Sequence, residues 1–244
     1  MKKLSQFFLL VFTLQYSSSS LAWGLKELGE EAASPMTTTA DRILLYGGIA
    51  TLAAIVFEDN IDVAHDKVVN DKPLGDFSRY GDWAGQMVPN ALYVIGQTMY
   101  GAAGNKVGFE RALGMFKATA YAASVTTVLK YTIQEPRPDM HNERNSFPSG
   151  HTTTAFAFGG YILEEHGWKW GVPALLISSF SGLSRVNDNR HRVHDVLAGA
   201  TIGLAYGVAI AKIDRARKEK SEHNFTVVPI FDQETKGLAL IGSF

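Results

Sequence analysis

Apolar and polar segments alternate along this chain, and the spacing of the apolar residues predicts helices. Over residues 111–129, apolar side chains recur at intervals of three and four, which places them on one face of a helix that ends near Lys130. Pro136 and Pro138 then break the pattern and predict a turn that presents Arg137. The other apolar runs cover residues 43–57, 83–105, 151–163, 171–183 and 191–211. The chain is therefore predicted to fold as an all-α helical bundle of about six core helices.

Glycine is regularly spaced in the last of these runs. Gly199, Gly203 and Gly207 occupy every fourth position, so they share one face of the predicted helix. Small residues with this spacing allow two helix backbones to approach closely, within a membrane or outside it. We therefore expect this helix to pack tightly against a neighbour through its glycine face.

Both ends of the chain differ from this helical middle. Residues 1–22 combine two lysines, an apolar stretch and a final Ser-Leu-Ala, which together predict a cleaved signal peptide and an exported protein. Residues 23–40 are polar and rich in small side chains, and we expect a linker that ends in a helix cap. The helical domain follows at 41–223, and residues 224–244 are predicted to form a short tail with two strand-like segments.

Residues 58–82 separate two of the apolar runs and are rich in aspartate. Alternating Asp and Asn residues are typical of calcium-binding loops, but the oxygen-ligand spacing and the closing Glu of such loops are absent from this segment. We interpret the segment as a solvated loop.

Composition and the lengths of the apolar runs indicate whether the protein associates with nucleic acid or with membranes. The chain has 244 residues, no cysteine and a formal net charge of −1, and it has no basic arm of the kind that binds nucleic acid. Runs such as 43–57 and 171–183 are shorter than the roughly 20 apolar residues that a membrane span needs, and mean hydropathy is −0.01. These values favour a periplasmic helical domain in contact with the membrane over an integral one. The main counter-evidence is a basic cluster that would suit the cytoplasmic flank of a membrane span or an anionic lipid surface: Lys212, Arg215, Arg217 and Lys218.

Three short runs carry the candidate chemistry: Lys130 to Pro138, Phe147 to His151 and Ser184 to Asp195. Between them they supply three cations, two histidines, a Ser-Gly turn before a predicted helix, and a carboxylate four residues after the second histidine. Three cations can neutralise a phosphate dianion, and a helix N-terminus preceded by Ser-Gly favours the same anion. One histidine can attack phosphorus, the other can protonate the leaving oxygen, and the carboxylate can orient the attacker.

Each of these residues also has an ordinary explanation when taken alone. A Lys or Arg at a helix end is usually a solvated cation that interacts with the helix dipole, and a single histidine is more often packed or at the surface than catalytic. His191, His194 and Asp195 would also share a helix face, as metal ligands can. We do not favour a metal site because zinc motifs such as HExxH are missing from the sequence.

Taken together, the runs resemble the signature of the type-2 phosphatidic acid phosphatase superfamily, which includes membrane lipid phosphatases, bacterial class A acid phosphatases and vanadium haloperoxidases. That signature reads K-x6-RP, PSGH and SR-x5-H-x3-D, and the chain matches each part without a gap or substitution. The resemblance covers roughly residues 110–210. It implies a helical bundle with the phosphate site at helix ends.

The resemblance also implies a role for each matched residue, and it implies that no metal or other cofactor takes part. His191 would be the nucleophile that forms a phosphohistidine, Asp195 would set its tautomer, and His151 would act as general acid and then as general base. The phosphate oxygens would be held by the remaining matched residues: Lys130, Arg137, Ser149, Gly150 and Arg185. His194 is outside the pattern and is treated as neighbouring structure.

The expected function is hydrolysis of a phosphate or pyrophosphate ester of a bacterial envelope lipid by a membrane-associated enzyme in, or facing, the periplasm. Candidate substrates are phosphatidate, phosphatidylglycerol phosphate, undecaprenyl diphosphate and lipid A, because residues 146–152 and 195–199 are closer to the lipid branch of the superfamily. The alternative is a soluble periplasmic acid phosphatase that acts on small phosphomonoesters, which the signal peptide and low hydropathy favour. Less favoured are a haloperoxidase, whose chains are usually much longer, and an inactive protein that binds phosphate or lipid headgroups.

Overall fold

The computed structural model describes four stretches of the chain: residues 24–139, 142–222, 225–231 and 236–242. The chain divides into two compact units, Met1–Ala33 and Ser34–Phe244. The predicted signal peptide, residues 1–22, lies outside the described residues.

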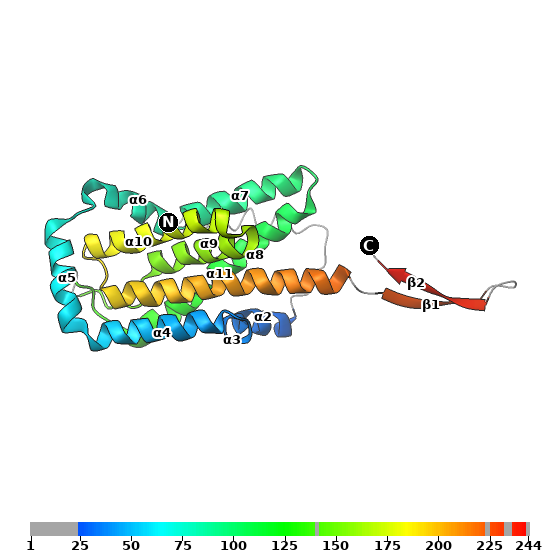
Figure 1. Ribbon diagram of the computed structural model, residues 1–244, viewed down its shortest axis with the longest axis horizontal. Helices are drawn as coiled ribbons and strands as arrows, with labels where there is room; N and C mark the ends of the chain where they lie inside the picture. The colour runs from blue at the N-terminus through cyan, green and yellow to red at the C-terminus, as the bar shows by residue number, and fades with distance from the viewer. Residues whose placement is uncertain (1–23, 140–141, 223–224, 232–235, 243–244) are drawn as a thin grey trace. The chain divides into compact units, whose positions relative to one another are not determined.

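The described residues confirm the predicted all-α fold, and a two-stranded hairpin follows the helices in sequence (Figure 1). Six of the described helices have 15 or more residues, in agreement with the number of core helices predicted. The helical elements are α2 (Leu25–Ala32), α3 (Ser34–Thr37), α4 (Asp41–Val56), α5 (Glu58–Asp71), the 3-10 turn η1 (Gly75–Phe77), α6 (Ser78–Gly85), α7 (Val88–Ala102), α8 (Lys106–Ile133), α9 (Gly150–His166), α10 (Trp168–Asn187) and α11 (Val193–Glu222).

Helix α9 packs against α8, α10 and α11 in the middle of the helical domain (Figure 1). The glycine face of α11 makes a very close contact with it. A Cβ atom on Gly199, Gly203 or Gly207 would lie within 2.5 Å of a carbonyl oxygen of α9 or of its N-cap residue. Because side chains are excluded there, the two backbones pack directly together, which confirms the close packing predicted from the glycine spacing.

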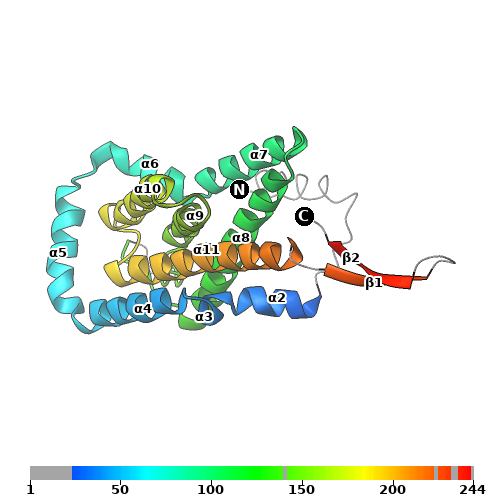
Figure 2. The same cartoon turned by 45° about the vertical axis from the view of Figure 1, so that its right-hand side comes forward.

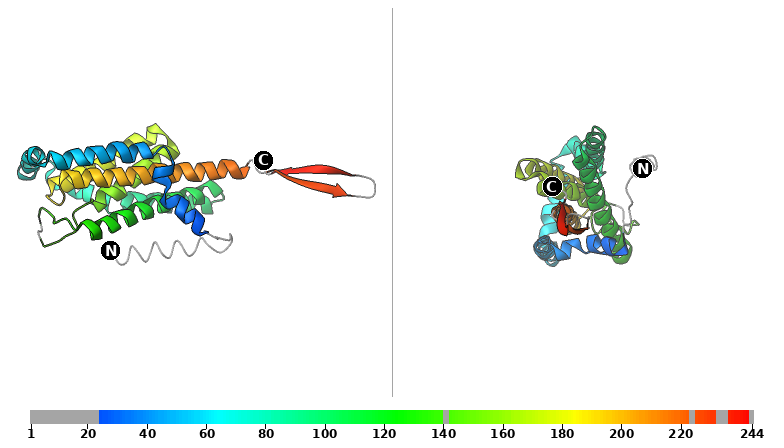
Figure 3. Two further views of the ribbon diagram at one scale, coloured as in Figure 1. Left: turned by 90° about the horizontal axis from the view of Figure 1, so that it is seen from below. Right: turned by 90° about the vertical axis from the view of Figure 1, so that its right-hand side faces the viewer.

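Helix α4 runs beside α11, as Figure 1 and the left view of Figure 3 both show. Gly47 makes room for this contact, because a Cβ there would lie 2.1 Å from Oγ1 of Thr201. The chain then bends by 87° into α5. Helix α5 leads from the end of α4 to the segment that contains α6, across the ends of the neighbouring helices (Figure 2).

Residues 58–82 are helical over most of their length, and this finding corrects the prediction of a solvated loop. Ile61, His65 and Val68 of α5 recur at intervals of three and four, and they line a cavity beside α10 and α11. Asp66 lies on the exposed side of the same helix. Helix α5 therefore has a polar face that includes Asp66, and composition alone did not distinguish this amphipathic helix from a loop.

Residues 23–40, where we expected a linker, contain the short helices α2 and α3. In α2, Lys26 and Glu30 stand one helical turn apart, with Nζ and Oε1 separated by 3.9 Å. Polar residues that pair along a helix resemble a linker in composition, which explains the difference. The boundary between the two compact units follows Ala33.

The C-terminal tail contains the two expected strands. Strand β1 covers Phe225–Phe231 and strand β2 covers Lys236–Gly242. The strands are antiparallel, with Phe225 opposite Gly242 and Phe231 opposite Lys236.

One described helix is long and apolar enough to cross a membrane, namely α11 over Val193–Lys220, and 61% of its most apolar window is buried. The bent pair of α4 and α5 passes the same test if the two are counted together. The outer faces of α4 and α10 carry many large apolar side chains that are exposed, among them Leu45, Ile49, Leu52, Trp168, Trp170 and Leu176.

Candidate active site

Helix ends bring the three sequence runs together. Lys130 lies in the last turn of α8, and Ser149 is the N-cap of α9. Arg185 lies in the last turn of α10, and Asp195 lies in the first turn of α11. The turn between α10 and α11 carries His191. Each of these helices therefore contributes one of its ends to the site.

His191 and Asp195 form a buried pair. Nδ1 of His191 lies 3.4 Å from Oδ2 of Asp195, and the two residues are 1% and 0% exposed. The same carboxylate oxygen accepts hydrogen bonds from Oγ of Ser146 at 2.6 Å and from the backbone N–H of Arg192 at 2.9 Å. Because the carboxylate holds the ring on its Nδ1 side, Nε2 is the ring nitrogen left for a ligand.

Burial and hydrogen bonding set the protonation of this pair. Burial lowers the pKa of His191, against the opposing effect of its hydrogen bond to Asp195. Burial acts to raise the pKa of Asp195, but hydrogen bonds from His191 and Ser146, together with the charge of His191, outweigh it, so this pKa lies below its usual value. The lowered pKa of His191 favours a neutral imidazole beside the carboxylate, the state that a nucleophilic histidine needs.

Lys130 and Arg137 meet at the segment that precedes α9. Nζ of Lys130 donates to the carbonyl oxygen of Ser146 at 3.1 Å and also to that of Asn145. Nε of Arg137 donates to Oδ1 of Asn145 at 2.6 Å and lies 3.3 Å from Oε2 of Glu143. Burial, followed by the charge of Arg137, lowers the pKa of Lys130 to about 8. Two desolvated cations beside each other favour an anion between them.

Arg185 is 5% exposed and only partly satisfied by its neighbours. Nε donates to Oγ of Ser184 at 3.2 Å, and Nη1 donates to Oδ1 of Asp82. Nη2 lies 3.5 Å from Oδ2 of Asp188, yet this buried nitrogen has no hydrogen-bond partner among the described residues. An unpartnered guanidinium N–H in a buried position is suited to a phosphate oxygen.

Ser149 and Gly150 place the N-terminal end of α9 beside the lysine. The N–H of Ser149 donates to the carbonyl oxygen of Asp195 at 2.9 Å, and Oγ1 of Thr152 donates to Oγ of Ser149 at 3.0 Å. A Cβ at Gly150 would lie 3.8 Å from Cε of Lys130. The positive end of a 17-residue helix thus adds to the charge of the cations.

His151 lies in the first turn of α9, and its side chain is 34% exposed. Nε2 is 3.2 Å from Oδ1 of Asp82. Burial and then the charge of Arg185 lower the pKa of His151 to about 4, while Asp82 acts in the opposite direction. The backbone N–H of His191 donates to the carbonyl oxygen of Arg185 at 3.3 Å, and this bond connects His151, Asp82 and Arg185 to the other predicted site residues.

Sequence reasoning missed two residues of the site. Asp82 comes from α6, in the segment that was interpreted as a loop, and no spacing pattern pointed to it. Ser146 stands just before the PSGH run, and only this position could have drawn attention to it. His194 is held by Glu135, with Nε2 and Oε1 separated by 2.9 Å. Together with Asp195, these two residues place three possible metal-ligating atoms within 4.8 Å of one another, and the interpretation of His194 as neighbouring structure stays a prediction.

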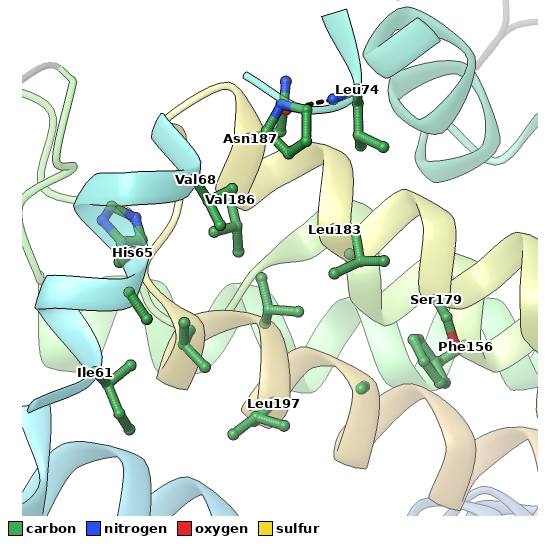
Figure 4. Close-up of a pocket in the computed structure, with 16 residues that line it drawn as sticks. Ile61, His65, Val68, Leu74, Phe156, Ser179, Leu183, Val186, Asn187 and Leu197 are labelled. Carbon is green, nitrogen blue, oxygen red and sulfur yellow. Dashed lines mark hydrogen bonds between the residues drawn. The ribbon is translucent and has the colours of Figure 1, made fainter. Parts of the chain in front are cut away.

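An apolar cavity of about 540 Å³ lies between α5, α10 and α11 (Figure 4). Leu183 and Val186 of α10 line it from one side and Leu197 of α11 from another. His65 of α5 is 6% exposed and also faces the cavity, and its Nε2 has no hydrogen-bond partner among the described residues. The cavity is lined almost entirely by carbon atoms, as a binding site for a hydrocarbon chain would be.

These features define an all-helical protein with a histidine- and cation-lined site suited to a phosphate group. The sequence model of the PAP2 superfamily matches residues 111–219, which include all three signature runs. This match covers less than half of the chain, and it agrees with the resemblance stated from the sequence.

Two curated relatives are lipid phosphatases by name. The lipid A 1-phosphatase of Porphyromonas gingivalis is 39% identical over 99 residues, which cover 39% of this chain and 21% of that protein. The probable diacylglycerol pyrophosphate phosphatase 1 of Schizosaccharomyces pombe is 26% identical over 142 residues, which cover 40% of this chain and 51% of that protein. The matched part of the chain thus spans about a fifth of the length of the first relative and about half of the length of the second.

A solved structure shares the fold. It is the transmembrane PAP2-type phosphatidylglycerolphosphate phosphatase from Bacillus subtilis, with a TM-score of 0.54 and 21% sequence identity. The match covers 78% of this chain and 98% of that one. The shared fold therefore extends beyond the segment that the superfamily model matches.

Proposed function

We propose that this protein is a metal-independent phosphatase that hydrolyses phosphate or pyrophosphate esters of envelope lipids through a phosphohistidine at His191. The observation that carries the proposal is the buried His191–Asp195 pair beside Lys130 and Arg185 at helix ends and Arg137 in the segment between α8 and α9. A neutral imidazole held by a carboxylate is a nucleophile, and fixed cations stabilise the charge of a phosphoryl group during its transfer.

The proposed reaction has two steps. In the first, Nε2 of His191 attacks phosphorus, the bond from phosphorus to the leaving oxygen breaks, and His151 gives that oxygen a proton. In the second, a water molecule loses a proton to His151 and attacks phosphorus, and the phosphorus–nitrogen bond to His191 breaks. Asp195 keeps the His191 ring in one tautomer through both steps.

The cations and the N-terminal end of α9 would hold the phosphoryl oxygens. Lys130, Arg137 and Arg185 supply positive charge in the place where other phosphoryl-transfer sites use a metal ion. The hydroxyl group of Ser149 and the backbone N–H of Gly150 complete the site as hydrogen-bond donors. Nη2 of Arg185, which has no hydrogen-bond partner among the described residues, is the donor that a bound phosphate would satisfy.

Three observations favour a lipid over a small soluble ester. The names of the two relatives specify lipid A and diacylglycerol pyrophosphate as substrates of those proteins. The apolar cavity beside α10 and α11 suits a hydrocarbon chain, and the exposed apolar faces of α4 and α10 suit contact with a membrane. With the predicted signal peptide, these features support a membrane-associated enzyme of the bacterial envelope that acts on the periplasmic side.

The test is phosphate release by the full-length protein in EDTA, from phosphatidate in mixed micelles and from a soluble aryl phosphate. His191→Ala removes the proposed nucleophile. His166→Ala, which changes a histidine at the far end of α9, is the matched control.

We expect faster release from the lipid, loss of that release in His191→Ala, and retention in His166→Ala. Equal or faster turnover of the soluble ester would instead assign the protein to the soluble acid phosphatases. Release that survives in His191→Ala would contradict the phosphohistidine.

A further inference from the structure

Asp82 is a carboxylate in the site that none of the three signature runs contains, and it lies outside the residues matched by the superfamily model. Its Oδ1 lies 3.2 Å from Nε2 of His151 and accepts a hydrogen bond from Nη1 of Arg185. Its Oδ2 accepts a hydrogen bond from Nε2 of Gln86 at 2.6 Å. Both carboxylate oxygens are therefore in use, and the side chain is held from three sides.

Two glycines bring α6 close enough for this contact. A Cβ at Gly81 would lie 2.5 Å from Oγ of Ser184, and a Cβ at Gly85 would lie 2.5 Å from Cβ of His151. The glycines flank Asp82 in sequence, so α6 is fixed against α9 and α10 on both sides of it. The contact between the carboxylate and the histidine thus follows from backbone packing, and not from the reach of a flexible side chain.

We propose that Asp82 is a positioning residue that holds His151 as the general acid, so that the site contains a second histidine–carboxylate pair beside His191 and Asp195. This inference rests on the phosphatase function proposed above. Nδ1 of His151 has no hydrogen-bond partner among the described residues, so it is available to a leaving oxygen while Nε2 lies 3.2 Å from Oδ1 of Asp82. When the phosphorus–oxygen bond breaks, the Nδ1 proton passes to the leaving oxygen, and in the second step Nδ1 takes a proton from water.

The alternative is that Asp82 occupies the position of the phosphate and must leave before substrate binds. Arg185 argues against it. Its Nη1 donates to Asp82 and its Nε donates to Ser184, but its buried Nη2 has no hydrogen-bond partner among the described residues. Arg185 therefore keeps a donor for a phosphate oxygen while Asp82 remains in place.

The charges that face His151 explain why a carboxylate is needed there. Burial lowers its pKa most, and Arg185 on α10, His191 in the next turn and Arg137 before α9 lower it further, whereas Asp82 on α6 raises it. Without Asp82 the proton on His151 would be lost at a still lower pH. A bound phosphate dianion brings more negative charge to the same place and acts in the same direction as Asp82.

The test compares Asp82→Asn with Asp76→Asn, which changes an exposed aspartate in the preceding 3-10 turn. Full-length protein is assayed with an alkyl phosphate, whose leaving oxygen needs a proton, and with p-nitrophenyl phosphate, whose leaving group does not. For Asp82→Asn we expect kcat/KM to fall about 100-fold with the alkyl ester and less than about tenfold with the nitrophenyl ester. The alkaline limb of the pH profile should move to lower pH, and Asp76→Asn should match the wild type.

A double-mutant cycle separates positioning from a structural effect. In a His151→Ala background, Asp82→Asn should cause no further loss with the alkyl ester, because the group that Asp82 acts through is gone. Equal losses with both esters and an unmoved pH profile would overturn the proposal. Faster turnover or tighter binding of inorganic phosphate in Asp82→Asn would overturn it in favour of the alternative.

Titration of His151 by NMR, in the wild type and in Asp82→Asn, needs no turnover. The proposal requires a lower His151 pKa in the variant, and an unchanged value would refute it. If the wild type releases phosphate neither from these esters nor from phosphatidate, the phosphatase function fails, and the titration still decides whether Asp82 controls the proton on His151.

Discussion

Replacing Gly199 with alanine tests how the packing of α11 controls the site. The new Cβ would lie 2.5 Å from the carbonyl oxygen of Ser149, whereas ordinary contact begins at 3.4 Å, so the two backbones must separate by roughly 0.9 Å. Ser149 is the N-cap of α9, and its N–H donates to the carbonyl oxygen of Asp195 at 2.9 Å. Separation therefore moves the proposed phosphate cradle relative to the carboxylate that orients His191.

We expect Gly199→Ala to lower both stability and turnover. Overpacking against a backbone atom costs about 1–3 kcal/mol of stability, and the higher helix propensity of alanine offsets up to about 1 kcal/mol of that cost. We therefore expect Gly199→Ala to lower the free energy of unfolding by about 1–2 kcal/mol. A displacement near 1 Å in a positioned catalytic group lowers turnover by up to about 100-fold, and we expect a loss of that order in kcat.

Gly207→Ala is the matched control. Its Cβ would lie 2.5 Å from the carbonyl oxygen of Ala157, which is the same clash between the same two helices, at about 12 Å further along the helix axis. Thermal unfolding should show similar losses in both variants, whereas kcat per folded molecule should fall only in Gly199→Ala. Gly48→Ala, at a position with open space, should reduce neither quantity. Equal kcat values in Gly199→Ala and Gly207→Ala would refute the proposed coupling.

Three further predictions concern single residues. Because the pKa of Lys130 is about 8, its charge is present below that pH and lost above it. We therefore expect KM to rise above about pH 8 in the wild type and to stay constant in Lys130→Arg. Similar KM profiles in the two proteins would contradict this prediction. Ser146→Ala removes a 2.6 Å hydrogen bond to Asp195 and should lower the free energy of unfolding in urea by about 1 kcal/mol, whereas Ser146→Thr should restore it. An unchanged free energy of unfolding in Ser146→Ala would show that this bond is unimportant. Asp195→Asn should lower kcat by about 1,000- to 10,000-fold in single-turnover assays, and a loss below tenfold would exclude its orienting role.

The sequence predicted the long helices, and it named most of the residues that meet in the candidate site, because both depend on short-range spacing. Each spacing pattern describes one helix face: the intervals of three and four within residues 111–129, and the four-residue spacing of Gly199, Gly203 and Gly207. The structure places both faces against neighbouring helices. Each signature run combines a helix end with the residues beside it, so local sequence determines what each helix end presents. The meeting of these ends then follows from the packing of α8, α9, α10 and α11.

Asp82 and helix α5 could not be predicted in the same way. Aspartates at 58–82 gave a loop-like composition, and the buried side of α5 is visible only once α10 and α11 supply the surface that it faces. Asp82 enters the site because Gly81 and Gly85 allow α6 to approach Ser184 and His151, which are far away in sequence. Long-range contacts of this kind leave no periodic signal in the chain itself.

The central claim, a covalent phosphohistidine at His191, is tested most directly by trapping it. The full-length protein would be mixed with phosphatidate carrying a radiolabelled phosphate in EDTA, quenched in alkali within one turnover, and mapped by peptide. We predict label on the peptide that contains His191, stable to base, labile to acid, lost in a chase with unlabelled substrate, and absent from His191→Ala. Label on a different residue, or phosphate release at the wild-type rate by His191→Ala, would contradict the mechanism.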